Sequence, residues 1–152
     1  MSVAFRRESD EEHKEPRFEL PIPPGPNLVT SRGLQLIEDR IAALESDLAT
    51  SGTEGREAIE RDLRYWRTRR ATAELAPVPT GDTVAFGSRV TYRIDGRERT
   101  IEIVGDDEAD PPSGRVAFSA PLVRAMMGAD AGETVMFGAR GIDLLTTAPI
   151  AD

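Results

Sequence analysis

The chain has 152 residues, of which 39% are hydrophobic and 5% aromatic, enough for one ordinary domain with an appendage. It has no cysteine, which excludes disulfides and cysteine-based zinc sites, and its single histidine, His13, stands in a charged segment that favours no catalytic triad. A formal net charge of −8 argues against nonspecific nucleic-acid binding, and no apolar run reaches the roughly 18 residues of a membrane span. With no secretory signal either, we expect a cytoplasmic protein that has a protein partner and no membrane contact.

Residues 1–29 are predicted to form a flexible or extended arm. Many charges are followed by the run PIPPGPN, in which four prolines remove backbone donors and prevent a continuing helix. A plain linker is one interpretation. The alternation of Phe18, Leu20 and Ile22 leaves a short strand or docking peptide as the alternative.

Helical periodicity begins at Thr30 or Ser31, either of which suits the N-cap of a helix. The apolar residues then follow at alternating spacings of three and four, as in a coiled-coil seam: Leu34, Ile37, Ile41, Leu44 and Leu48. After a break at residues 50–55, the same spacing continues through Ile59, Leu63, Trp66, Arg70 and Ala73. Two helices joined by a short turn predict an antiparallel hairpin over residues 30–76, ended by Pro77 and Pro79.

Residues 80–152 carry strand signals. The positions expected to face a core alternate with polar residues: Val90, Tyr92, Ile94, Ile101, Ile103, Val116, Phe118, Val135, Phe137, Ile142 and Leu144. Asp95 and Gly96 form a strong hairpin-turn pair, and Pro121 opens a short helix whose Leu122, Ala125 and Met126 should face the sheet. The prediction is an antiparallel sheet with one short helix, which makes the whole chain α+β.

The run IVGDDEADPPSGRVAFSAPLVRAMMGADAGETV at residues 103–135 resembles the C-terminal domain of the bacterial GreA/GreB family, whose recurring pattern is GEDEAD…SP.ARAL.G. The resemblance includes VAFGSRVTY at residues 84–92 and extends more loosely to VTSRGLQLIEDRIAAL at residues 29–44. It implies an FKBP-like domain that docks on the rim of the secondary channel of RNA polymerase, while the coiled coil enters the channel.

Carried over by position, the resemblance places the polymerase-binding surface at Ser119, Ala120, Pro121, Leu122, Arg124 and Met126. It sets Glu108 and Asp110 beside that surface, where they would meet basic residues of the polymerase. The alternatives are that Pro121 is an ordinary first-turn proline with Leu122 and Met126 in the core, and that the acidic loop is a solvated turn. The loop also imitates the start of a calcium site, but Pro111 replaces the required glycine, so no metal is expected.

Cleavage factors of the family carry the motif D..EN.EY at the hairpin tip, where carboxylates help to hold magnesium. This chain has SGTEGREA there, and Glu54 and Glu57 are better suited to the positive end of the second helix. The first arm, with about 19 helical residues, spans about 28 Å at 1.5 Å per residue, which is shorter than the arm of those factors. We therefore expect no cleavage stimulation, no catalytic residue and no cofactor.

The second helix carries six arginines, which favour contact with nascent RNA or with an acidic channel wall: Arg56, Arg61, Arg64, Arg67, Arg69 and Arg70. The alternative is a solvated helix balanced by the neighbouring carboxylates of Glu38, Asp39, Glu45, Asp47, Glu60 and Asp62.

The resulting expectation is a noncatalytic, monomeric protein that binds RNA polymerase and modulates elongation. Two alternatives stay within the fold, namely a regulator similar to Rnk and a true cleavage factor that uses Glu54 and Glu57. A remote alternative is a peptidyl-prolyl isomerase, because the domain is FKBP-like by resemblance. Its aromatic residues, however, are few and mostly assigned to the core. Self-association of the hairpin into a four-helix bundle is the alternative to a monomer.

Overall fold

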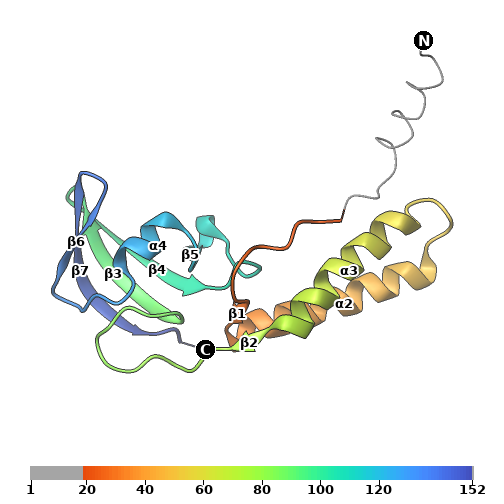
Figure 1. Cartoon of the computed structure of the whole chain (residues 1–152), viewed down its shortest axis with the longest axis horizontal. Helices are drawn as coiled ribbons and strands as arrows, with labels where there is room; N and C mark the ends of the chain where they lie inside the picture. Colours follow the sequence, from red (N-terminus) through yellow and green to blue (C-terminus); the bar gives the residue numbers. More distant parts are fainter. Residues whose placement is uncertain (1–18, 152) are drawn as a thin grey trace, which may run out of the picture. The chain divides into compact units, whose positions relative to one another are not determined.

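The computed structural model describes residues 19–151, and its contacts divide them into two units (Figure 1). The described part of the first unit comprises residues 19–24 and 37–72, and the second unit comprises residues 25–36 and 73–151. Phe18 and His13 lie outside the described residues, and Leu20 and Ile22 belong to no regular element. Within residues 19–151, no helix is long and apolar enough to cross a membrane.

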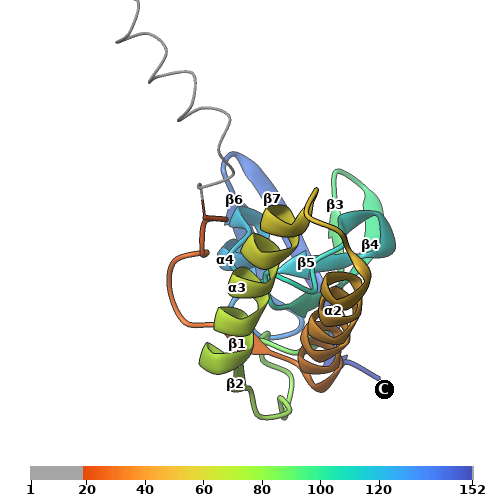
Figure 2. The same ribbon diagram turned by 90° about the vertical axis from the view of Figure 1, so that its right-hand side faces the viewer.

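Helices α2 (Ser31–Thr50) and α3 (Arg56–Thr72) form the predicted hairpin, and they lie side by side in Figures 1 and 2. The seam residues Ile37, Ile41 and Leu63 are buried, as their spacing predicts. Further along α3 the buried residue is Arg69, at 1% exposure, whereas Arg70 is exposed. The predicted seam was wrong at that position, because a helix of 3.6 residues per turn drifts away from a strict 3.5-residue repeat.

Two short strands that the sequence did not reveal flank the hairpin along the chain. Strand β1 (Leu28–Val29) pairs in parallel with β2 (Glu74–Leu75). The Glu74 amide donates to the carbonyl of Asn27 at 2.8 Å, and the Ala76 amide donates to the carbonyl of Val29 at 3.1 Å. This pairing joins the two strand residues that precede α2 to the two that follow α3.

The sheet contains five strands in the order β5-β4-β3-β7-β6. The strands are β3 (Ser88–Ile94), β4 (Arg97–Val104), β5 (Arg115–Ala117), β6 (Thr134–Phe137) and β7 (Arg140–Pro149). All neighbouring pairs are antiparallel except β4 and β5, which are parallel. The chain between these two strands crosses over through the acidic loop and the 3-10 turn η1 (Pro111–Ser113), so β5 re-enters in the same direction. The α+β fold class is confirmed, and the sheet is mixed rather than wholly antiparallel.

The turn between β3 and β4 is the one that Asp95 and Gly96 predict. Their φ angles are +53° and +76°, so both central residues are left-handed, as a type I′ hairpin turn requires. The register follows directly, with Ile94 opposite Arg97. The turn thereby places the alternate residues of both strands on the same face.

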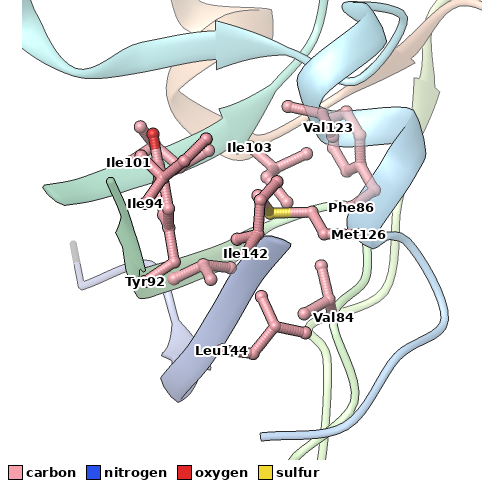
Figure 3. Close-up of a cluster of buried hydrophobic side chains, with 11 residues drawn as sticks. Val84, Phe86, Tyr92, Ile94, Ile101, Ile103, Val123, Met126, Ile142 and Leu144 are labelled. Atoms are coloured by element: carbon pink, nitrogen blue, oxygen red, sulfur yellow. The ribbon is translucent and has the colours of Figure 1, made fainter. Parts of the chain in front are cut away.

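One face of the sheet and the helix α4 (Pro121–Met126) enclose the core, which Figure 3 shows in close-up. The strands contribute Val90, Tyr92, Ile94, Ile101, Ile103, Ile142 and Leu144, and the segment before β3 contributes Val84 and Phe86. From α4, Val123 and Met126 are fully buried, whereas Leu122 and Ala125 are half-buried. Met126 is therefore buried as the sequence predicts. The other fully buried residue of α4 is Val123, one helical turn earlier, rather than Leu122 or Ala125.

Candidate docking surface and hairpin tip

The start of α4 is held in a fixed conformation by short-range hydrogen bonds. Ala120 is extended, with φ −66° and ψ 143°, and Pro121 occupies the first turn, where its missing amide costs nothing. The Ser119 hydroxyl donates to a carboxylate oxygen of Asp106 at 2.7 Å, and the Ala120 amide donates to the carbonyl of Ala117 at 2.9 Å. The loop that the resemblance assigns to docking is thus preorganised.

The predicted docking residues divide between surface and core. Ser119, Pro121 and Arg124 are exposed, and Ala120 and Leu122 are half-buried. Met126 is fully buried in the core, which contradicts its assignment to the docking surface. It lies on the sheet-facing side of α4, so its side chain has no access to a partner unless the helix moves.

Glu108 occupies an internal position that sequence reasoning did not foresee. Its side chain is 4% exposed and accepts hydrogen bonds from the hydroxyl of Thr30 at 2.6 Å and from Nη1 of Arg32 at 3.2 Å. Thr30 also accepts the Gly33 amide at 2.9 Å and is thus the N-cap of α2. Glu108 therefore holds the first turn of α2, and its predicted role in partner binding stays a prediction.

The same joint depends on the absence of side chains at two glycines. A Cβ atom on Gly33 would lie 2.8 Å from a carboxylate oxygen of Glu108. A Cβ atom on Gly105 would lie 2.3 Å from the backbone carbonyl oxygen of Leu28. The strand β1 and the first turn of α2 therefore pack closely on the acidic loop, which accounts for both residue choices.

Asp110 is exposed, but its polar groups already have local partners. Its carboxylate accepts the hydroxyl of Ser113 at 2.7 Å, and its backbone amide donates to the carbonyl of Arg115 at 2.8 Å. The residue thereby fixes the entry to η1. Its predicted contact with polymerase stays a prediction.

Glu54 and Glu57 are both exposed at the hairpin tip, but Glu54 lies in the turn and Glu57 in helix α3. Gly55, with φ +83°, separates them, and Glu57 lies in the first turn of α3 beside the positive end of the helix. The neighbouring Arg56 pairs with Glu60 at 3.4 Å along the helix. No group of three or more acidic, histidine or cysteine side chains suited to a metal occurs among residues 19–151.

The arginines of α3 are largely paired. The ion pairs join Arg56 to Glu60, Arg61 to Asp62, Arg64 to Glu19 and Arg67 to Glu45. Hydrogen bonds from the Arg64 guanidinium lower the pKa of the Glu19 carboxyl. Arg69 is buried over the ring of Tyr65, at 6.0 Å. This arrangement favours the balanced, solvated helix over an RNA-binding surface.

A hollow of about 620 Å³ lies elsewhere in the second unit, between the first turn of α2, residues 76–79 and the sheet. Among the described residues that line it, Phe86 is the one aromatic residue. A prolyl pocket is built from several aromatic walls, so this hollow does not support isomerase chemistry. Tyr92, another aromatic residue of this domain, belongs to the core and does not line the hollow.

Residues 79–146 match the sequence family described as transcription elongation factor GreA/GreB, C-terminal domain. The chain therefore contains a GreA/GreB C-terminal domain. It is 41% identical over 83 residues to transcription elongation factor GreA of Chelativorans sp. strain BNC1, covering 49% of this chain and 53% of the relative. It is 36% identical over 95 residues to GreA of Rhizobium leguminosarum bv. trifolii strain WSM2304, covering 61% and 58%. The chain thus spans a little over half the length of these GreA relatives.

Among solved structures, the GreA factor homolog 1 (Gfh1) of Thermus thermophilus is similar at 14% identity, with a TM-score of 0.40. That similarity covers 81% of this chain and 99% of Gfh1.

Proposed function

We propose that this GreA/GreB-type chain binds bacterial RNA polymerase at the rim of the secondary channel and modulates elongation without stimulating transcript cleavage. The observation that carries the proposal is the family match of residues 79–146, combined with a preorganised loop at Ser119–Pro121. A fixed backbone at a docking loop reduces the ordering cost of association. Binding is thus assigned to the C-terminal domain, and the chain is proposed to be no enzyme.

The absence of cleavage is proposed from the chemistry and reach of the hairpin. Helix α2 has 20 residues. At 1.5 Å per residue it therefore spans about 30 Å. Magnesium-dependent cleavage at a distant centre requires converging carboxylates, because hard cations take several oxygen ligands. Glu54 lies in the turn, Glu57 lies in the first turn of α3 beyond the left-handed Gly55, and residues 50–57 contain no aspartate.

The direct experiment adds the purified chain to backtracked RNA polymerase complexes and measures shortened RNA on a denaturing gel, with GreA of Rhizobium leguminosarum as the positive control. We expect no shortened RNA above the background of polymerase alone. Cleavage that depends on Glu54 and Glu57 would instead make this chain a true cleavage factor. Failure of the chain to bind polymerase at all would refute the wider proposal.

Replacing both Glu54 and Glu57 with alanine is expected to leave the dissociation constant for RNA polymerase within about twofold of wild type, because these exposed side chains are assigned no energetic contact. Fluorescence anisotropy with a labelled chain measures this constant. A loss of tenfold or more would show that the tip contributes to binding, contrary to the proposal.

A further inference from the structure

The outer side of α4 extends one residue beyond the helix to an exposed methionine. We propose that Pro121, Arg124 and Met127 form one contact stripe in which Met127 is the apolar anchor. We further propose that the stripe fits an apolar pocket bordered by carboxylates on RNA polymerase. This inference rests on the proposed function and names the chemistry of the partner at that same surface.

The geometry of α4 separates two sides. Val123 and Met126, three residues apart, are fully buried against the sheet, and both point into the core in Figure 3. Pro121, Arg124 and Met127 follow one another at the same interval and are all exposed. Pro121 and Arg124 are three apart in the helix and lie on one side of it, and Met127 follows as its extended C-cap. These three exposed residues define the stripe.

The backbone at Met127 is fixed although its side chain is open. The Met127 amide donates to the carbonyl of Val123 at 3.0 Å, and the next amide, that of Gly128, donates to the carbonyl of Val84 at 2.9 Å. The residue is 38% exposed. A methionine on a fixed backbone adapts its flexible thioether to an irregular apolar pocket, with only side-chain ordering to offset.

The charge of the stripe indicates what lies opposite. Within residues 19–151, no carboxylate forms an ion pair with Arg124, in contrast to the paired arginines of α3. The chain as a whole carries a net charge of −8, whereas the one charged residue of this stripe is a cation. An arginine between proline and methionine is stabilised on binding by a carboxylate beside an apolar surface. The charge complementarity therefore favours a pocket with an acidic rim.

Four other large apolar side chains are exposed in the described part of the chain: Ile22, Leu75, Val78 and Met136. None of them lies on the element that carries the predicted docking residues. Met136, on β6, is 60% exposed and thus more open than Met127. It is therefore a matched control for a change of methionine that leaves the stripe intact.

The test measures the dissociation constant of the full chain for purified RNA polymerase by fluorescence anisotropy. Met127→Asp and Arg124→Glu are each expected to weaken binding by about tenfold or more, as removal of an interface anchor does. Met127→Leu and Arg124→Lys should stay within about threefold of wild type, because apolar volume or charge is kept. The controls are Met136→Asp on β6 and Arg97→Glu at the exposed start of β4, both outside the stripe, and they are expected to bind as wild type does. Unchanged urea midpoints establish that each variant is folded.

The outcomes distinguish this inference from the proposed function. If the wild-type chain does not bind polymerase, the proposed function fails. If the wild type binds and Met127→Asp binds equally well, only the anchor is overturned. Tighter binding by Arg124→Glu would overturn the proposal that carboxylates border the pocket on the polymerase. A wild-type dimer in sedimentation that Met127→Asp dissolves would make a second copy of this chain the occupant, which also overturns the inference.

Discussion

Replacing Gly105 with alanine is expected to lower the free energy of unfolding of the second unit by about 3 kcal/mol, the upper range of overpacking effects. The new Cβ atom would lie 2.3 Å from the carbonyl oxygen of Leu28 and 3.8 Å from the Cα atom of Val29. The clash is with backbone, so no side-chain rotation relieves it, and Gly105 is itself buried. Urea denaturation followed by circular dichroism measures the loss.

Gly141→Ala is the matched control, because its Cβ atom would meet only the Thr134 Cγ2 atom, at an ordinary 3.6 Å. Gly141 also lies in a strand of the same unit. This change is expected to alter the free energy of unfolding by less than about 1 kcal/mol. Equal urea midpoints for the two variants would contradict the close packing of the acidic loop on β1.

Glu108→Ala is expected to cost about 2 kcal/mol, because it leaves the hydroxyl of Thr30 and the guanidinium of Arg32 without their acceptor. Both contacts converge on a carboxylate whose side chain is 4% exposed. The local consequence should appear as faster hydrogen exchange of the amides in the first turn of α2, measured by mass spectrometry on peptides. Glu108→Gln keeps one acceptor oxygen and should lose less.

The comparison for this change is Glu98→Ala. Glu98 pairs with Arg93 at 3.1 Å, and its side chain is 59% exposed. An exposed pair of this kind contributes roughly 0–1 kcal/mol, so its removal should leave both stability and exchange of the α2 amides nearly unchanged. If Glu108→Ala behaves like Glu98→Ala, the carboxylate does not hold the start of α2.

Local patterns predicted the elements that repeat a signal over several residues. The alternation in β3 and β4, the Asp95–Gly96 turn and the Pro121 helix start all appear in the structure, since each is determined by neighbours in sequence. The two-residue strands β1 and β2 are too short to show any period. Their parallel pairing joins residues more than 40 positions apart, which no local pattern reveals.

The candidate site was predicted only in part, for a similar reason. The resemblance located α4, but the division of its residues between core and surface depends on how the helix rotates against the sheet. That rotation buries Met126 and exposes Met127, two identical side chains in adjacent positions. The sequence alone does not distinguish Glu108 from a solvated carboxylate, because its partners Thr30 and Arg32 are 78 and 76 residues away. The one available signal was Gly33, whose missing side chain makes room for that carboxylate.

The α4 stripe and the hairpin tip carry different weight in the proposed function. The stripe on α4 combines a fixed backbone, an exposed methionine and an arginine that forms no ion pair within residues 19–151, which suits recognition. The tip combines a left-handed glycine with two separated glutamates, which does not suit a metal centre. The proposed activity is therefore binding to the polymerase without stimulation of transcript cleavage.

The most direct test is a competition measurement in which the unlabelled chain is titrated into a complex of RNA polymerase with fluorescently labelled GreA of Rhizobium leguminosarum. We predict that the wild-type chain displaces the labelled GreA fully and suppresses its cleavage of backtracked RNA. Ser119→Arg places a bulky side chain in the docking loop and removes the hydroxyl that donates to Asp106, so it should displace GreA at least about tenfold less effectively. Persistence of the labelled complex at saturating concentrations of the wild-type chain would contradict the account.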